Sequence, residues 1–241
     1  MRSLAFIFVS IVAGALSGII LSGINLFVVE PYTDKAIEIE AQRDGTLEPN
    51  INSDDFDSYR NWQKSGTFFA GVVLGLAYGA ILGVVYGITQ KHLPFSGNKK
   101  KAIFLALVIC LTLFVVPFIK YPANPPGVGD PGTIDSRQAL YVQYQFVSCM
   151  VTLGISILYY RIRSKNFVAY IIPVVYILAI SIIHSIFPQT NNEISIPVDL
   201  VNSFRIVSAA SIVTVWFVLG IVFGLLWNKL KPNDNAKITT M

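Results

Sequence analysis

The chain has 241 residues, of which 54% are hydrophobic and only 13% are charged. This charged share is about half of that in an ordinary soluble domain. The apolar residues gather in blocks of about 20 or more residues, the length that crosses about 30 Å of hydrocarbon. These features exclude a soluble globular domain and favour a protein that crosses a membrane several times.

Six apolar blocks predict six membrane-spanning helices, because a backbone in lipid must satisfy its own hydrogen bonds. They are 4–29, 66–90, 102–119, 138–160, 167–187 and 205–228. The first block is longer than the apolar region of a signal peptide and lacks an A-x-A cleavage site, so we expect it to be retained. The predicted fold is all-α, a polytopic transmembrane helical bundle that forms a single domain over residues 1–241.

The charges divide between the two sides of this bundle. One side carries 11 of the 18 basic residues, in the amino terminus, 91–101, 161–166 and the tail from 229. The other side carries 13 of the 14 acidic residues, in 30–65, 120–137 and 188–204. The positive-inside rule places the basic side, with both termini, in the cytoplasm of a cell-membrane protein. The net charge of +4 is the sum of two opposite faces, so it does not indicate nucleic-acid binding, and the lipid bilayer is the expected partner.

The first predicted outer loop, 30–65, holds nine carboxylates. Its stretch 31–43 has helical spacing, whereas 44–57, with Gly45 and Pro49, is expected to be irregular. The carboxylates could concentrate divalent cations near an entrance, and their hard oxygen atoms suit Ca²⁺ or Mg²⁺ better than softer metals. The alternative is a solvated loop that balances the basic side.

The second predicted outer loop, 120–137, is rich in proline and glycine. It has four prolines and three glycines between Pro122 and Gly132. Proline fixes its own φ and pushes the preceding residue toward extended geometry. We therefore expect a stiff, shaped loop rather than a flexible linker.

This loop carries a resemblance to a known family. Residues 121–134 read Tyr-Pro-Ala-Asn-Pro-Pro-Gly-Val-Gly-Asp-Pro-Gly-Thr-Ile, and the run resembles the archaeal-type signature of the CbtA family of predicted cobalt transporter subunits. The plan of a first helix, a long polar outer loop and a glycine-rich second helix is similar too. The positions that match the motif are Tyr121, Pro122, Asn124, Pro125, Pro126, Gly129, Asp130, Arg137 and Tyr141.

The resemblance implies a role in cobalt uptake, with Co²⁺ as the transported ion and no firm cofactor. It also implies a small membrane partner subunit of the CbtB type, which has a His-rich stretch. Many family members carry histidines in the first outer loop, and this sequence has none in 30–65. Direct metal capture by that loop therefore does not carry over.

A glycine recurs every fourth residue in the second apolar block. These residues are Gly71, Gly75, Gly79, Gly83 and Gly87. Spacing of four keeps them on one helix face, where missing side chains let a neighbouring backbone approach closely. The row predicts tight helix packing, and a sliding or gating surface is the alternative.

Polar residues follow one face of the fourth block. The candidates for lining a permeation route are Gln138, Gln145, Ser148 and Thr152. Polar groups in the membrane usually face the protein interior or a water-filled path. Hydrogen bonding between helices is the alternative interpretation.

Two side chains within the apolar blocks are candidate metal ligands. His184 lies near the outer end of the fifth block, and cobalt accepts imidazole well. Cys149 in the fourth block is a softer candidate. Near the outer start of the sixth block, Arg205 is expected either to pair with Asp199 or to reach the lipid headgroups.

Neither a Walker A motif, nor H-E-x-x-H, nor G-x-S-x-G is present, so we predict no enzymatic activity. The leading hypothesis is a membrane subunit of an uptake system for cobalt or a related divalent cation. The alternative is a structural or assembly subunit of a larger membrane complex with no transport activity of its own.

Overall fold

A computed structural model describes residues 3–43, 53–162, 168–190 and 193–232. The described residues contain helices and no β-strand, which confirms the predicted all-α class. The α-helices are α1 (Ser3–Ile24), α2 (Glu30–Arg43), α3 (Ser53–Thr89), α4 (Asn98–Cys110), α5 (Val116–Lys120), α6 (Ile134–Ile162), α7 (Val168–Ile186) and α8 (Val198–Leu230). A short 3₁₀ turn, η3 (Pro131–Thr133), precedes α6.

Two π-helical turns join α-helices end to end. The turn η1 (Asn25–Val29) connects α1 to α2, and η2 (Leu111–Val115) connects α4 to α5. Each lies two residues before a proline, Pro31 or Pro117. Proline has no backbone N–H to donate, so the hydrogen-bond register has to shift there.

Within the described residues, five helical rods are long and apolar enough to cross a membrane, which confirms a multi-pass membrane protein. They are Ser3–Arg43, Ser58–Thr89, Asn98–Lys120, Pro131–Ile162 and Val198–Leu230. The apolar part of α7, Ile171–Ile186, is shorter. Each predicted apolar block overlaps the apolar part of one of these rods or of α7.

The segment 30–65 differs from the loop that the sequence predicts. Helix α2 continues the first rod to Arg43, which confirms the helical spacing of 31–43. Helix α3 begins at Ser53, so residues 53–57 are helical rather than irregular. Residues 44–52 lie outside the described part of the chain. The two helices are held together by charge: Arg60 pairs with Glu30 at 2.6 Å and also with Asp34.

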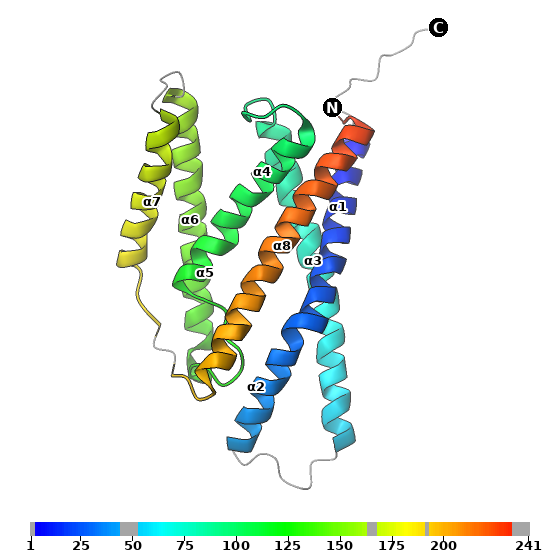
Figure 1. Ribbon diagram of the computed structural model, residues 1–241, viewed down its shortest axis with the longest axis vertical. Coiled ribbons are helices and arrows are strands. Elements are labelled where there is room, and N and C mark those ends of the chain that lie inside the picture. The colour runs from blue at the N-terminus through cyan, green and yellow to red at the C-terminus, as the bar shows by residue number, and fades with distance from the viewer. Residues whose placement is uncertain (1–2, 44–52, 163–167, 191–192, 233–241) are drawn as a thin grey trace.

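The bundle has two ends of different character (Figure 1). The basic end contains the start of α1, residues 90–101 and the end of α8. The acidic end contains α2, residues 121–133 and the described residues between α7 and α8. Because α1 begins and α8 finishes at the same end, the described chain crosses the bundle an even number of times.

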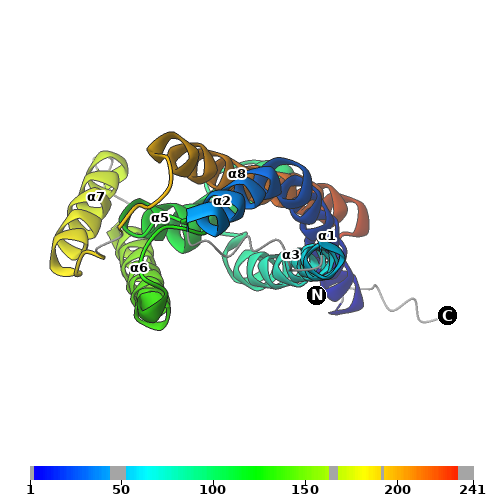
Figure 2. The ribbon, with the colours of Figure 1, turned by 90° about the horizontal axis from the view of Figure 1, so that it is seen from below.

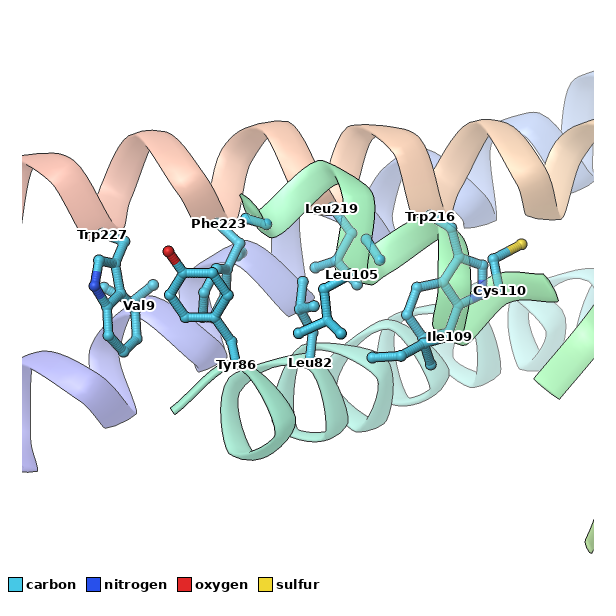
Figure 3. Close-up of a cluster of buried hydrophobic side chains, with 13 residues drawn as sticks. Val9, Leu82, Tyr86, Leu105, Ile109, Cys110, Trp216, Leu219, Phe223 and Trp227 are labelled. Atoms are coloured by element: carbon cyan, nitrogen blue, oxygen red, sulfur yellow. The ribbon is translucent and has the colours of Figure 1, made fainter. Parts of the chain in front are cut away.

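Helices α1, α3, α4 and α8 form the main bundle, in which α1 packs on α3 and α8, and α4 packs on α8. Figure 3 shows its aromatic core as a row of side chains between α8 and α3. The ring of Trp227 contacts the rings of Tyr86 and Phe223, with centroids 4.8 and 5.3 Å apart. Trp216 packs on Tyr78 with centroids 4.5 Å apart.

The glycine row of α3 lies against α1. A Cβ added at Gly14 of α1 would meet the carbonyl oxygen of Gly75 at 2.7 Å, and one added at Gly18 would meet Val72 Cα at 2.8 Å. Gly75 and Gly79 also lie against the backbone of α1, whereas Gly71 and Gly83 lie against the side chains of Ser22 and Ser10. Gly87 meets only the end of the Phe6 ring. In lipid, where helices gain little by hiding apolar surface, such close backbone contact is a main source of packing energy.

Helices α6 and α7 stand to one side of the main bundle (Figure 2), and we call them the side hairpin. Helix α7 packs on α6, and α6 packs on η2 and α5. Only Tyr144 and Ser148 of α6 are buried. The side hairpin is therefore attached to the rest of the protein mainly along the second half of the α4–α5 rod.

Candidate functional site

A pocket of about 540 Å³ opens at the acidic end, between the Pro/Gly-rich loop and the start of α6. The loop forms one wall, and Phe114 of η2 and Phe118 of α5 form another. Its polar lining includes Glu40, Asn124, Arg137, Gln138 and Tyr141. A mostly apolar hollow with a few converging polar groups is the usual form of a binding site.

The Pro/Gly-rich loop is held in shape by the segment before α8. The Gly129 N–H donates to the Glu193 carbonyl at 2.8 Å, and the Ser195 N–H donates to the Gly127 carbonyl at 3.1 Å. Gly127 and Gly129 have φ values of +77° and +84°, which favour glycine strongly. Two segments that are far apart in sequence thus form one cap over the acidic end.

Arg137 ties this loop to α6. Its guanidinium donates to the carbonyl oxygens of Val128 at 3.3 Å and Asp130 at 3.2 Å. A Cβ at Gly129 would lie 2.6 Å from Arg137 Nη1, so the loop backbone passes directly against the guanidinium. Within the described residues, the partly buried Nε has no hydrogen-bond partner.

A second arginine, Arg205 of α8, holds the other part of the loop. Its Nη2 and Nε donate to the side-chain oxygen of Asn124 at 2.6 and 3.2 Å. The sequence predicts either a pair with Asp199 or contact with headgroups, and the structure corrects this, because the partner is the motif asparagine. The two residues are 81 positions apart, and no local pattern in a single sequence links them.

The loop begins at Tyr121, whose hydroxyl donates to the Pro188 carbonyl at 2.7 Å. Burial raises the pKa of Tyr121 above its usual value. Next to it, Lys120 Nζ donates to the carbonyl of His184 at 2.8 Å. Both contacts fasten the end of α5 to the end of α7.

Three of the four candidate route residues face the α4–α5 rod. Gln145 Nε2 donates to the Leu113 carbonyl at 2.7 Å, and Ser148 Oγ donates to the Thr112 carbonyl at 3.0 Å. Thr152 Oγ1 lies 3.1 Å from Thr112 Oγ1. Gln138 instead is exposed and lines the pocket. These contacts are hydrogen bonds between helices, the alternative that the sequence leaves open.

The two candidate metal ligands lie on neighbouring helices, Cys149 on α6 and His184 on α7. Both are partly buried. In the part of the chain that the structure describes, no three His, Cys, Asp or Glu side chains lie close enough together to hold a metal ion. Whether either residue binds cobalt stays a prediction.

The acidic hairpin uses some of its carboxylates internally. Burial alone would raise the pKa of Asp34, but hydrogen bonds and positive charge from Arg60 and Lys64 outweigh it, and the pKa is lowered from 3.8. Lys64 Nζ lies 2.9 Å from Asp34 Oδ2. Glu30 and Asp34 are therefore engaged in holding α2 to α3, whereas Glu40 lines the pocket.

Comparison with known protein families matches residues 4–228 to the CbtA family, described as a probable cobalt transporter subunit. The match covers the six apolar segments and the pocket, and it confirms the resemblance that the loop motif indicates. No curated protein and no solved structure matches the chain.

Proposed function

The chain belongs to the CbtA family of probable cobalt transporter subunits, and on this basis we propose that it is the membrane subunit of a system that takes up cobalt or a related divalent cation. The observation that carries the proposal is the pocket at the acidic end. Its wall is the loop that bears the family motif, and it lies where the side hairpin meets the α4–α5 rod.

In this proposal the acidic end faces outward and the basic end faces the cytoplasm. Lys99, Lys100, Lys101 and Lys229 lie at the basic end, as the positive-inside rule requires of a cytoplasmic face. Carboxylates at the other end would raise the local concentration of a divalent cation. The ion would enter from outside, through the pocket.

The motif residues then shape the entrance rather than bind the ion tightly. Arg137 and Asn124 position the loop through the contacts described above, and Glu40 supplies a carboxylate at the pocket wall. A cationic guanidinium beside the path would disfavour prolonged binding of a free cation. A small partner of the CbtB type would supply imidazole ligands, and His184 and Cys149 are the candidates within this chain.

The proposal is tested by uptake of labelled Co²⁺ into vesicles that contain the purified protein, with and without the small partner. Arg137→Gln removes two charge-assisted hydrogen bonds, each worth about 1.5–3 kcal/mol, so we expect a fall in initial rate of about tenfold or more. Arg161→Gln is the matched control, because this exposed arginine lies at the opposite end of the same helix.

Uptake no higher than in empty vesicles, with and without the partner, would overturn the proposal. In that case, copurification of the chain in fixed ratio with a different membrane enzyme would favour the assembly subunit. Equal rates for Arg137→Gln and Arg161→Gln would keep transport but remove the motif loop from it.

A further inference from the structure

The polypeptide chain connects the side hairpin to the main bundle at only one end of the molecule. The chain enters α6 and leaves α7 at the acidic end, where the loops are fastened by Arg137 and Tyr121. The last turn of α6 and the first turn of α7 lie at the basic end (Figure 1). There the ring of Tyr160 contacts His92, with centroids 4.9 Å apart, and no chain connection leads into the main bundle.

The packing of the side hairpin on the main bundle is thin. Of the residues of α6, only Tyr144 and Ser148 are buried, and no described side chain of α7 is. In lipid, apolar surface gives little reason for one helix to prefer another helix over lipid tails. The polar contacts between α6 and the α4–α5 rod therefore contribute much of the specificity of this docking.

Those polar contacts fall on a break in the rod. The Val116 N–H donates five residues back, to Leu111, and Pro117 has no N–H. The next two carbonyls, those of Thr112 and Leu113, stand five and four residues before Pro117, and so they lack the backbone donor of a regular helix. A π-turn followed by proline is a site where helices bend.

The side hairpin supplies donors for both freed carbonyls. Ser148 Oγ donates to Thr112 O at 3.0 Å, and Gln145 Nε2 donates to Leu113 O at 2.7 Å. These two hydrogen bonds, which we call the latch, are confined to one turn of α6. One turn further toward the basic end, Thr112 Oγ1 also donates to Thr152 Oγ1 at 3.1 Å. The remainder of α6 toward the basic end has no buried side chain.

We propose that the side hairpin is a moving unit, which turns against the main bundle about the Pro117 break and is held in the observed position by the latch. The pocket lies between the two units, because Phe114 and Phe118 belong to the rod while Arg137, Gln138 and Tyr141 belong to α6. Turning of the side hairpin changes the width of the pocket and the separation at the basic end. This motion stands whether or not the cargo is cobalt.

The test measures distances by pulsed electron spin resonance in lipid vesicles, with spin labels on introduced cysteines. All proteins carry Cys110→Ala and Cys149→Ala, because both native cysteines are free. One label pair, at Arg161 of α6 and Lys229 of α8, reports across the two units at the basic end. A second pair, at Lys35 of α2 and Lys229, reports within the main bundle and its extension.

The latch variant combines Gln145→Leu with Ser148→Ala. We expect it to lengthen the Arg161–Lys229 distance by about 5 Å, on the order of one helical turn, and to leave the Lys35–Lys229 distance unchanged. The matched control combines Gln143→Leu with Ser156→Ala, which are the same substitutions on exposed positions of the same helix that line no pocket.

An Arg161–Lys229 distribution that is the same in the latch variant, the control variant and the parent protein would overturn the proposal. If the latch variant also changes the Lys35–Lys229 distance, the test is repeated with Ser148→Ala alone, which removes only one hydrogen bond. The Arg161–Lys229 distance of that variant is then compared with those of the control variant and the parent protein. Loss of cobalt uptake plays no part in this outcome, so failure of the proposed cargo leaves the test intact.

Discussion

Gln145 should stabilise the protein only because Pro117 is present. Gln145→Leu removes the side-chain donor to the Leu113 carbonyl, whose regular backbone donor is already missing at Pro117. Pro117→Ala restores a backbone N–H that can reach the same oxygen, four residues back. The substitution Gln145→Leu should therefore be costly in the parent protein and nearly without effect in Pro117→Ala.

The magnitude follows from the environment of the bond. Hydrogen bonds between membrane helices are worth about 0.6 kcal/mol on average and at most about 1.7 kcal/mol. The Gln145 bond is short, at 2.7 Å, and its acceptor has lost the backbone donor, so a value of about 1 kcal/mol is expected. That corresponds to about a fivefold change in the unfolding equilibrium.

The assay is a double-mutant cycle in which the free energy of unfolding is measured by titration with a denaturing detergent in mixed micelles. The coupling between Pro117→Ala and Gln145→Leu should equal most of the cost of Gln145→Leu alone. Gln138→Leu is the control, because within the described residues its side chain makes no hydrogen bond, and its coupling to Pro117→Ala should be close to zero. An equal cost of Gln145→Leu in both backgrounds would refute the hydrogen-bond account of the break.

Three further predictions concern other contacts. Gly75→Ala should destabilise the bundle by about 1–3 kcal/mol in the same assay, because the new Cβ meets the backbone of Gly18, whereas Gly66→Ala on the same helix, with open space around it, should be neutral or stabilising. Because the pKa of Asp34 is lowered in the folded protein, its ion pairs with Arg60 and Lys64 stabilise the α2–α3 contact fully above a pH of about 4 and lose that effect as the pH falls further. Asp34→Asn should therefore reduce the acid sensitivity of the helical circular dichroism signal, and an unchanged pH profile would count against this account. A disulfide between Thr112→Cys and Thr152→Cys, whose hydroxyl oxygens lie 3.1 Å apart, should fix the side hairpin and stop cobalt uptake until it is reduced, and full uptake in the oxidised protein would contradict this.

The helical segments could be predicted from the sequence because one physical length governs them. About 20 apolar residues cross the hydrocarbon, and no soluble constraint produces so many such blocks. The prediction is wrong in 53–57, where helix α3 continues beyond the apolar region. The hydrophobicity of the local sequence does not predict this extension, because it is stabilised by ion pairs such as Arg60–Glu30, which join residues 30 positions apart.

The pocket could be predicted only in part. The prolines and glycines of residues 121–133 indicate a shaped loop, but its partners lie elsewhere, on Arg205 and in the Gly129–Glu193 backbone pair. These contacts join segments more than 60 residues apart, and the side chains involved follow no period. The composition of a segment thus indicates that its backbone is rigid, whereas only the fold determines which residues it contacts.

The polar stripe of α6 shows why a polar membrane helix has no single interpretation. Spacing of three to four residues places Gln145, Ser148 and Thr152 on one face, and that face is the same whether it lines water or meets another helix. The second element that distinguishes the two is Pro117, on a different helix, because it frees the two carbonyls that the stripe then satisfies. A polar stripe should therefore be read together with the prolines of its neighbours, since each missing backbone donor requires a side-chain donor at the same depth. In this protein two adjacent carbonyls, those of Thr112 and Leu113, lack their regular backbone donors, and Ser148 and Gln145 donate to them. These two side chains therefore stabilise the break in the rod. Gln138, which lines the pocket, is the residue of the stripe best placed to meet a transported ion.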